Sequence, residues 1–277
     1  MAAQSNQVFF PGSLAELFNA WTRFPDAVPF AGGTDIIRRQ GSSGLRLPRT
    51  ILALGGIEEL ARMSRTERYL EIGAMVKLRD LIRLGKIVPE ALTRTLEGIA
   101  GPQLRGLAAI GGNICSPGRR LDCTAPLIAL DAVYEIRSAQ SARWVSAARF
   151  SLPDGPVLGG QELLTRIRIP LDQWDFSAYR KFGARNSRAE GGVLIFIMKN
   201  RKNILTSLHI VFAGECIFRD QLSEASLAGK QLPLSRRDAQ DFSARWRETL
   251  AGLEKPSPLI RSELQNYVES LIYNLAD

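Results

Sequence analysis

The sequence predicts an α+β protein in which strands and helices are grouped instead of alternating regularly. Three β-like segments follow one another at residues 177–183 (SAYRKFG), 191–200 (GGVLIFIMKN) and 204–214 (ILTSLHIVFAG), and two amphipathic helical segments come after them. Runs of strands followed by runs of helices indicate this class. With 277 residues, 45% of them hydrophobic, the chain can bury one large core or two ordinary ones.

The first predicted element is an amphipathic helix. Ser13 and Glu16 have the S-x-x-E spacing of a capping box, which marks a helix start. Leu14, Leu17 and Trp21 follow at helical spacing, and the pattern ends at the proline that comes next.

The next predicted elements alternate between short strands and helices. Strands are expected at 27–30 (AVPF), 49–54 (RTILAL) and 68–75 (RYLEIGAM), and helices at 78–86 and 88–100. The last of these helices is expected to place Leu92, Leu96 and Ile99 on one face.

Three apolar or alternating runs between residues 126 and 170 are predicted to be strands joined by turns. They are PLIALDAVYEIRS, RWVSAARF and QELLTRIRIP. Pro170, followed by LDQWD, marks the expected domain boundary, so we predict domains at 1–172 and 173–277. The final helices carry Phe242, Trp246 and Leu250, and then Leu264 and Val268.

The net charge of +8 is compatible with nucleic acid, an anionic cofactor or acidic protein partners. The basic residues are scattered and are not clustered with aromatics, which argues against nucleic acid. The chain has no run of 18 apolar residues, and its first residues lack the pattern of a signal peptide. We therefore expect a cytoplasmic protein that does not enter a membrane.

Cysteine and histidine usage excludes several kinds of site. Three cysteines without CxxC spacing argue against a disulfide framework, a zinc site or an iron–sulfur cluster held by this chain alone. The single histidine, His209, lies in a β-like apolar run, where a structural role is favoured over a catalytic one. No metal site is expected.

Two glycine pairs are the most informative local feature. They occur in PFAGGTDI (29–36) and in AAIGGN (108–113). Glycine pairs expose main-chain N–H groups, and successive N–H groups in a turn bind anions, so two such turns could hold a dinucleotide. Asp35 and Asn113 could bond their own turns or reach ligand hydroxyls. Ordinary turns are the alternative, since neither segment has the G-x-G-x-x-G or GxxxxGK[ST] pattern.

Several segments, taken together in order, resemble a known family. AGGTD, GAMVKLRDLIR, IGGN, D..APLIALDA and ELLTRIRIP are similar to the FAD-binding (medium) subunit of the molybdenum hydroxylases, which include xanthine dehydrogenase and carbon monoxide dehydrogenase. The resemblance covers about residues 8–185. It implies a PCMH-type FAD-binding domain at 1–172, with subdomains at about 1–55 and 56–172. A smaller C-terminal α+β domain at 173–277, with a three-stranded sheet and helices, would follow.

The resemblance also implies which residues contact FAD. The main chain of both glycine segments would wrap the pyrophosphate: Pro29, Phe30, Ala31, Gly32, Gly33, Thr34, Asp35, Ile36, Ala109, Ile110, Gly111, Gly112 and Asn113. Four further residues would lie on the flavin side: Ile99, Asp122, Leu164 and Lys181. No catalytic acid, base or nucleophile is expected, because the flavin supplies the chemistry.

Some residues depart from the family pattern. Ala109 stands where many relatives have Thr or Ser, and Gly118, Arg119 and Arg120 stand where small residues are usual. The two arginines could strengthen phosphate binding, contact a partner or reflect an altered site. For Lys181, a surface lysine on a strand edge is the alternative to a flavin contact.

The implied function is electron transfer within a complex. An iron–sulfur small subunit would pass electrons from a molybdopterin large subunit to FAD on this chain, and FAD would pass them to NAD or another acceptor. A stand-alone flavin oxidoreductase and a scaffold subunit that binds no FAD are the alternatives.

Overall fold

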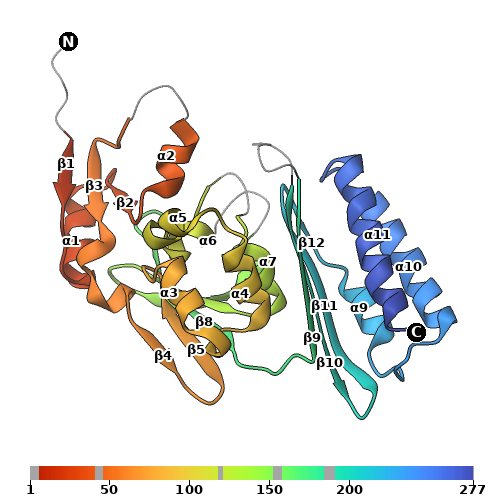
Figure 1. Cartoon of the computed structure of the whole chain (residues 1–277). Coiled ribbons are helices and arrows are strands. Elements are labelled where there is room, and N and C mark those ends of the chain that lie inside the picture. The colour runs from red at the N-terminus through yellow and green to blue at the C-terminus, as the bar shows by residue number, and fades with distance from the viewer. Residues whose placement is uncertain (1–5, 41–45, 118–120, 152–157, 184–190, 277) are drawn as a thin grey trace. The chain divides into compact units, whose positions relative to one another are not determined.

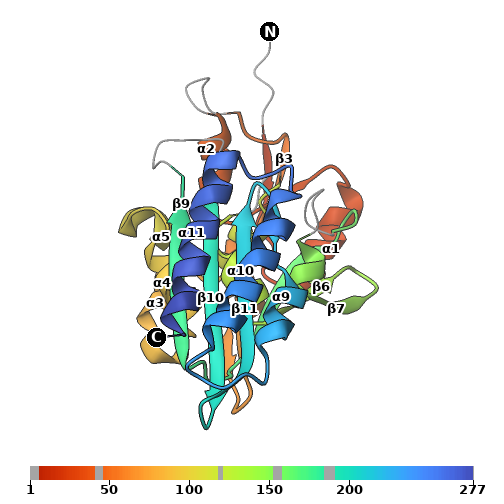
Figure 2. The same cartoon turned by 90° about the vertical axis from the view of Figure 1, so that its right-hand side faces the viewer.

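The computed structural model of the chain describes residues 6–40, 46–117, 121–151, 158–183 and 191–276 (Figures 1 and 2). The departures noted at Gly118, Arg119 and Arg120 lie outside the described residues. The chain forms two compact units: unit 1 contains Met1–Pro89, Ile99–Pro117 and Asp131–Leu171, and unit 2 contains Glu90–Gly98, Gly118–Leu130 and Asp172–Asp277. The last segment of unit 2 starts near the predicted boundary, and two earlier segments join it.

Unit 1 begins with a small parallel sheet covered by the first helix. Strands β1 (Gln7–Phe9), β2 (Val28–Phe30) and β3 (Thr50–Ala53) pair in the order β1-β3-β2. Helix α1 (Leu14–Arg23) starts at Ser13, whose side chain accepts a hydrogen bond from the main-chain N–H of Glu16, as the sequence predicts. Its buried face packs with Leu52, Leu54 and Leu60 into one apolar cluster.

A five-stranded antiparallel sheet completes unit 1. It contains β4 (Met63–Arg65), β5 (Tyr69–Gly73), β6 (Val133–Arg137), β7 (Ala142–Ser146) and β8 (Leu163–Pro170), in the order β4-β5-β8-β6-β7. Alternate residues of the inner strands, such as Leu70, Ile72, Tyr134, Ile136 and Ile167, are fully buried. The period of two places the residues between them on the opposite face of the sheet.

Short helices link the strands of unit 1. They are α2 (Thr34–Gln40), α3 (Leu78–Arg83), α5 (Pro102–Leu107), α6 (Ile110–Ile114) and α8 (Ala147–Phe150), with 3-10 turns at Leu54–Gly56, Glu58–Leu60 and Gly85–Ile87. The second glycine pair was expected in a turn but lies inside α6. The helical bond from Asn113 N–H to the Ala109 carbonyl, 3.1 Å long, encloses both glycines.

Unit 2 is built on a four-stranded antiparallel sheet. Its strands β9 (Phe176–Phe182), β10 (Gly192–Arg201), β11 (Ile204–Gly214) and β12 (Ile217–Phe218) have the order β12-β11-β10-β9. The three predicted strands are present, and the two-residue β12 extends the expected three-stranded sheet by pairing Phe218 with Phe212.

Helices pack on the sheet of unit 2 from two parts of the chain. Helices α9 (Gln221–Leu227), α10 (Arg236–Ala251) and α11 (Pro258–Asn274) lie together over the sheet in Figure 2. Helices α4 (Glu90–Glu97) and α7 (Thr124–Ala129) contact β10, with α4 also against β9 and α7 against β11. One apolar cluster joins the sheet to α9, α10 and α11, and its fully buried members include Phe196, Phe212, Phe242, Trp246 and Leu264.

Two sequence predictions about these helices were wrong. PLIALD was expected to begin a strand, but residues Thr124–Ala129 form α7, and every one of them is buried. A short, fully apolar run has no periodicity that separates a buried strand from a buried helix. Helix α4 ends at Glu97, so Ile99 lies beyond the helix whose face it was expected to share.

His209 on β11 has contacts within unit 2. Its Nδ1 lies 2.5 Å from the carbonyl oxygen of Ala129, at the end of α7, and its Nε2 lies 3.4 Å from Ser207 Oγ. The Trp174 ring packs against the imidazole at a centroid distance of 4.9 Å. These contacts place the imidazole ring of His209 between its own strand, β11, and the end of α7.

Glu224 is a buried carboxyl with a consequence for stability. Burial raises its pKa from 4.5 to about 7, although the charge of Arg219 and the N–H of Ile210 favour the ionised form. Since the folded pKa exceeds the unfolded one, the contribution of Glu224 to stability is complete below about pH 4.5 and is lost as pH rises to about 7. We expect the free energy of unfolding to fall across this window in the natural protein and less steeply in Glu224→Gln.

Urea denaturation followed by circular dichroism at several pH values would measure this slope. Glu248→Gln, which changes an exposed carboxyl on α10, is the matched control and should follow the natural protein. Equal slopes for all three proteins would contradict the assignment to Glu224.

Candidate functional site

The first glycine segment joins β2 to α2. Gly33 has a φ of +68°, a conformation that glycine adopts without strain. The N–H of Ile37 donates to the Gly33 carbonyl at 3.0 Å and makes the first helical bond. The N–H groups of Thr34, Asp35 and Ile36 therefore lack an intrahelical acceptor, which is the usual condition at a helix start. Pro29 and Phe30 end β2, and Ala31 and Gly32 form the link.

Gly32 has a packing role. A Cβ atom at this position would lie 2.0 Å from the carbonyl oxygen of Leu107 at the end of α5. Lys77 Nζ donates to the same oxygen at 3.1 Å. Partial burial lowers the pKa of Lys77, and the charge of Asp80 opposes this shift. The bare backbone at Gly32 thus lets two parts of unit 1 meet, and Lys77 brings a cation beside it.

The second segment offers fewer free donors than the sequence suggested. Ala109 precedes α6, and the next two N–H groups are taken: Ile110 donates to Val76 at 3.0 Å, and Gly111 to Ala74 at 2.8 Å. Gly112 is exposed, and a Cβ atom there would lie 3.8 Å from the Ala31 Cβ, at ordinary contact distance. The two glycine segments are therefore neighbours within unit 1, and Gly112 lies where they meet.

The carboxylate of Asp35 is held by protein groups. It accepts hydrogen bonds from Arg38 Nε at 2.9 Å, Arg39 Nε at 2.6 Å and Ser116 Oγ at 2.7 Å. Burial alone would raise the pKa of Asp35, but the bond from Ser116 and the charges of Arg38 and Arg39 outweigh it and hold the pKa low. The Asp35 side chain thus bonds the protein itself: Arg38 and Arg39 belong to its own helix α2, and Ser116 lies just after α6. These contacts tie α2 to the segment after α6.

Ser116 was missed by the sequence analysis. It is buried, and its partner Asp35 is 81 residues away along the chain. A serine beside a proline carries no local pattern that would have identified it.

Asp122 and Lys181 lie together in unit 2. Lys181 on β9 forms an ion pair with Asp122 and approaches the Gly98 carbonyl at 3.4 Å. The Lys181 side chain is 46% exposed and that of Asp122 15%. The two charged residues expected on the flavin side therefore neutralise one another, and the ion pair joins β9 to the segment before α7.

Tyr179 lies two residues before Lys181, on the same face of β9. Its hydroxyl is buried with no hydrogen-bond partner in the described structure, and a Cβ atom on Gly98 would lie 2.2 Å from it. Burial raises the pKa of Tyr179 to about 12, and the negative charge of Asp122 adds to this. The strand period of two could have identified this residue from the sequence.

Ile99 and Leu164, the other two predicted contacts, belong to unit 1. Ile99 is half-buried, and its carbonyl accepts a hydrogen bond from Arg105 Nη1 at 3.0 Å. Leu164 on β8 is 2% exposed and pairs with Ile136 across the sheet. Its side chain is therefore part of the core.

The described residues contain neither a metal-binding cluster nor a membrane-spanning helix. No group of three or more His, Cys, Asp or Glu side chains is placed to hold a metal ion there. Among the described helices, none has both the length and the apolar content needed to cross a membrane.

Comparison with known proteins adds a family assignment. The model of the family described as FAD binding domain in molybdopterin dehydrogenase matches residues 4–172. This range contains both glycine segments and the five-stranded sheet.

Curated relatives share this region. The chain is 31% identical over 182 residues to a xanthine dehydrogenase FAD-binding subunit of Escherichia coli O157:H7, covering 63% of this chain and 62% of that protein. It is 30% identical over 186 residues to aldehyde oxidase 1 of Bos taurus, covering 62% of this chain and 14% of that protein. The chain thus spans less than two thirds of the length of these relatives.

Solved structures share the fold of the chain. Quinoline 2-oxidoreductase from Pseudomonas putida 86 aligns with a TM-score of 0.82 and 21% identity, over 100% of this chain and 98% of that chain. Carbon monoxide dehydrogenase from Hydrogenophaga pseudoflava aligns with a TM-score of 0.81 and 23% identity, over 100% and 98%. The α+β fold predicted from the sequence is confirmed, and the match over residues 4–172 shows that the chain belongs to the family of the FAD-binding domain in molybdopterin dehydrogenase.

Proposed function

We propose that this chain binds FAD and serves as the electron-transfer subunit of a molybdenum hydroxylase complex. One observation carries the proposal: the family match spans both glycine segments, and these segments, far apart in the sequence, are neighbours at Ala31 and Gly112. Main-chain N–H groups of neighbouring segments can bind a pyrophosphate together, and here the start of α2 lies beside the exposed backbone of Gly112.

The residues of unit 1 fit a diphosphate. Thr34, Asp35 and Ile36 have main-chain N–H groups at the start of α2, where the helix dipole favours negative charge. Gly112 adds an exposed stretch of backbone without a side chain, and Lys77 adds a nearby cation. In this proposal, Pro29–Ile36 and Ala109–Asn113 hold the phosphates.

The residues predicted on the flavin side have positioning roles in this proposal. Asp122 and Lys181 would act as one neutral pair, so that neither brings an isolated charge to the flavin. Ile99 would offer a half-buried apolar contact, and Leu164 would support the site from the core.

Bound FAD would supply the redox chemistry, taking electrons from the iron–sulfur clusters of a small partner subunit and delivering them to NAD or another acceptor. A molybdopterin large subunit would be the second partner and would carry the substrate site. The chain would then be an oxidoreductase subunit that is active only in the complex.

A scaffold subunit without FAD is the second candidate, and one observation favours it. Ala109 has no hydroxyl to offer, and the N–H groups of Ile110 and Gly111 already bond Val76 and Ala74. The second glycine segment could thus be a purely structural joint.

A visible absorption spectrum distinguishes the two candidates. The purified chain, incubated with FAD and freed of excess, should show the flavin bands at about 370 and 450 nm. A colourless protein that is folded by circular dichroism would overturn FAD binding and leave the scaffold.

A further inference from the structure

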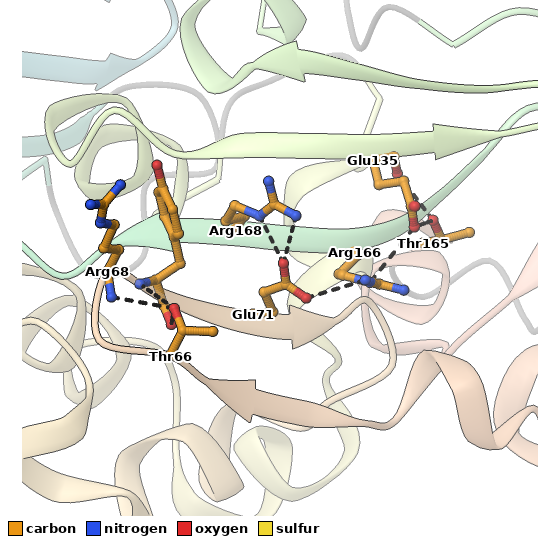
Figure 3. Close-up of polar contacts among 8 residues, drawn as sticks. Thr66, Arg68, Glu71, Glu135, Thr165, Arg166 and Arg168 are labelled. Atoms are coloured by element: carbon orange, nitrogen blue, oxygen red, sulfur yellow. Dashed lines mark hydrogen bonds and ion pairs between the residues drawn. The ribbon is translucent and has the colours of Figure 1, made fainter.

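The outward face of the five-stranded sheet of unit 1 carries an ordered network of charges (Figure 3). Glu71 on β5 pairs with Arg168 at 2.7 Å and with Arg166 at 3.2 Å, both on β8. Arg166 lies 3.7 Å from Glu135 on β6, and Thr165 donates to the same carboxylate at 2.7 Å. Two arginines and two glutamates therefore balance one another across three neighbouring strands.

Aromatic side chains lie beside this network. The Arg168 guanidinium lies 4.2 Å from the centre of the Trp144 ring and 5.4 Å from that of Tyr69. Trp144 is 40% exposed, Tyr69 38% and Met63 39%. Tyr, Trp, Met and Arg are the residue types enriched in protein interfaces, and ion pairs already fix the arginine here.

A groove of about 340 Å³ lies next to the network. Its apolar lining includes Leu14, Leu60 and Met63. Charged and polar side chains complete its walls: Glu59, Arg62, Ser64, Glu71, Glu135, Arg137, Thr165 and Arg166. The groove can thus accept a side chain with an apolar stem and a polar end.

The carboxylates of this groove already have donors. Glu59 accepts from the N–H of Leu14 at 3.3 Å, and Glu71 and Glu135 are paired as described above.

Arginines supply the unbalanced charge at the groove. The Arg137 side chain has no hydrogen-bond or ion-pair partner among the residues that the structure describes, and the Arg62 side chain has only a 3.9 Å surface pair with Glu58. Arg65 and Arg68 are exposed on the adjoining β4–β5 hairpin. The unpaired charge is therefore positive.

We propose that this surface docks an acidic surface of a partner subunit. We call it the arginine face, and it consists of Arg62, Met63, Tyr69, Arg137, Trp144 and Arg168. A carboxylate side chain of that subunit enters the groove and pairs with Arg137. This inference rests on the proposed function in one respect, namely that the chain works within a complex.

Two physical arguments favour this occupant. Complementary charge steers assembly and suppresses wrong partners, and the free cation of Arg137 needs an anion to be buried at low cost. The Glu71–Arg168–Trp144 arrangement holds its side chains in place before binding, which reduces the entropy lost on association.

The test uses the tagged full-length chain, expressed in its own cells and isolated with the subunits that accompany it. A photo-crosslinking residue replaces Trp144 in one preparation and Leu259, 67% exposed on α11, in another. The expected result is a cross-link from position 144 to a peptide that contains Asp or Glu, in a subunit recovered in equimolar amount. Position 259 should give no cross-link to that peptide.

Charge reversal completes the test. Arg137→Glu should lower recovery of that subunit about tenfold or more. Arg149→Glu, an equal charge change at an exposed position on α8, should leave it unchanged. Melting temperatures confirm that both variants fold, and the flavin bands are recorded on the same samples.

Four outcomes would overturn the inference. These are equal recovery with Arg137→Glu, a cross-linked peptide without carboxylates, self-association of the purified chain that Arg137→Glu abolishes, and saturable binding of free glutamate that Arg137→Glu removes. If the flavin bands are missing but recovery of the partner subunit still depends on Arg137, the result contradicts FAD binding and leaves the docking inference standing.

Discussion

Replacing Gly32 by alanine is expected to lower the free energy of unfolding by about 3 kcal/mol and to abolish flavin retention. The new methyl group would lie 2.0 Å from the Leu107 carbonyl oxygen and 2.8 Å from its carbon. Both are backbone atoms, so relief requires moving α5 away from the first glycine segment. Urea denaturation and the flavin absorption of the purified variant measure the two effects.

Gly160→Ala is the matched control for this substitution. Gly160 also lies in unit 1, and no heavy atom lies within 4 Å of a Cβ placed there. Its free energy of unfolding should stay within about 0.5 kcal/mol of the natural value. If Gly32→Ala is as stable as Gly160→Ala, the close approach to Leu107 does not constrain the loop.

Gly112→Ala is expected to separate cofactor binding from stability. A Cβ atom at Gly112 meets only the Ala31 Cβ, at 3.8 Å, so the fold accommodates it. Alanine in helix α6 should leave stability unchanged or raise it by up to about 1 kcal/mol. The methyl group would nevertheless stand on the exposed backbone where the two glycine segments meet, and we expect FAD affinity to fall about tenfold or more.

Titration of the chain with FAD, followed by quenching of flavin fluorescence, measures this effect. Gly55→Ala, where a Cβ has no neighbour within 4 Å, should bind FAD as the natural protein does. Equal affinity for Gly112→Ala and Gly55→Ala would remove Gly112 from the proposed site.

The parts of the fold that depend on neighbouring residues could be predicted from the sequence. The start of α1 follows from the Ser13 and Glu16 capping pattern, and β10 and β11 follow from long runs of β-branched and aromatic residues. α7 could not be predicted because its apolar run fits a strand equally well, and only packing against β10 and β11 decides between them. Helix α9 was missed because it has only seven residues after its N-cap, Asp220, which is too short for a clear helical period.

The candidate site shows the same division. The two glycine pairs were visible in the sequence, but the reason for Gly32, a carbonyl 75 residues further along at Leu107, was not. The contacts of Asp35 with Ser116 and of Lys77 with Leu107 also join distant segments. Local patterns predict which residue types lie at a site, whereas their partners are fixed by tertiary packing.

The composition of unit 2 has a consequence for synthesis on the ribosome. Helices α4 and α7 leave the exit tunnel before β9, β10 and β11, the strands that they cover. The apolar side chains of α7 therefore lack the sheet on which they pack until the C-terminal strands emerge, and unit 2 can complete its core only late in translation. For the same reason, a nascent chain stalled after residue 172 would expose these helices to chaperones and proteases. This would hold even though residues 4–172, the region that matches the family model, had already been synthesised.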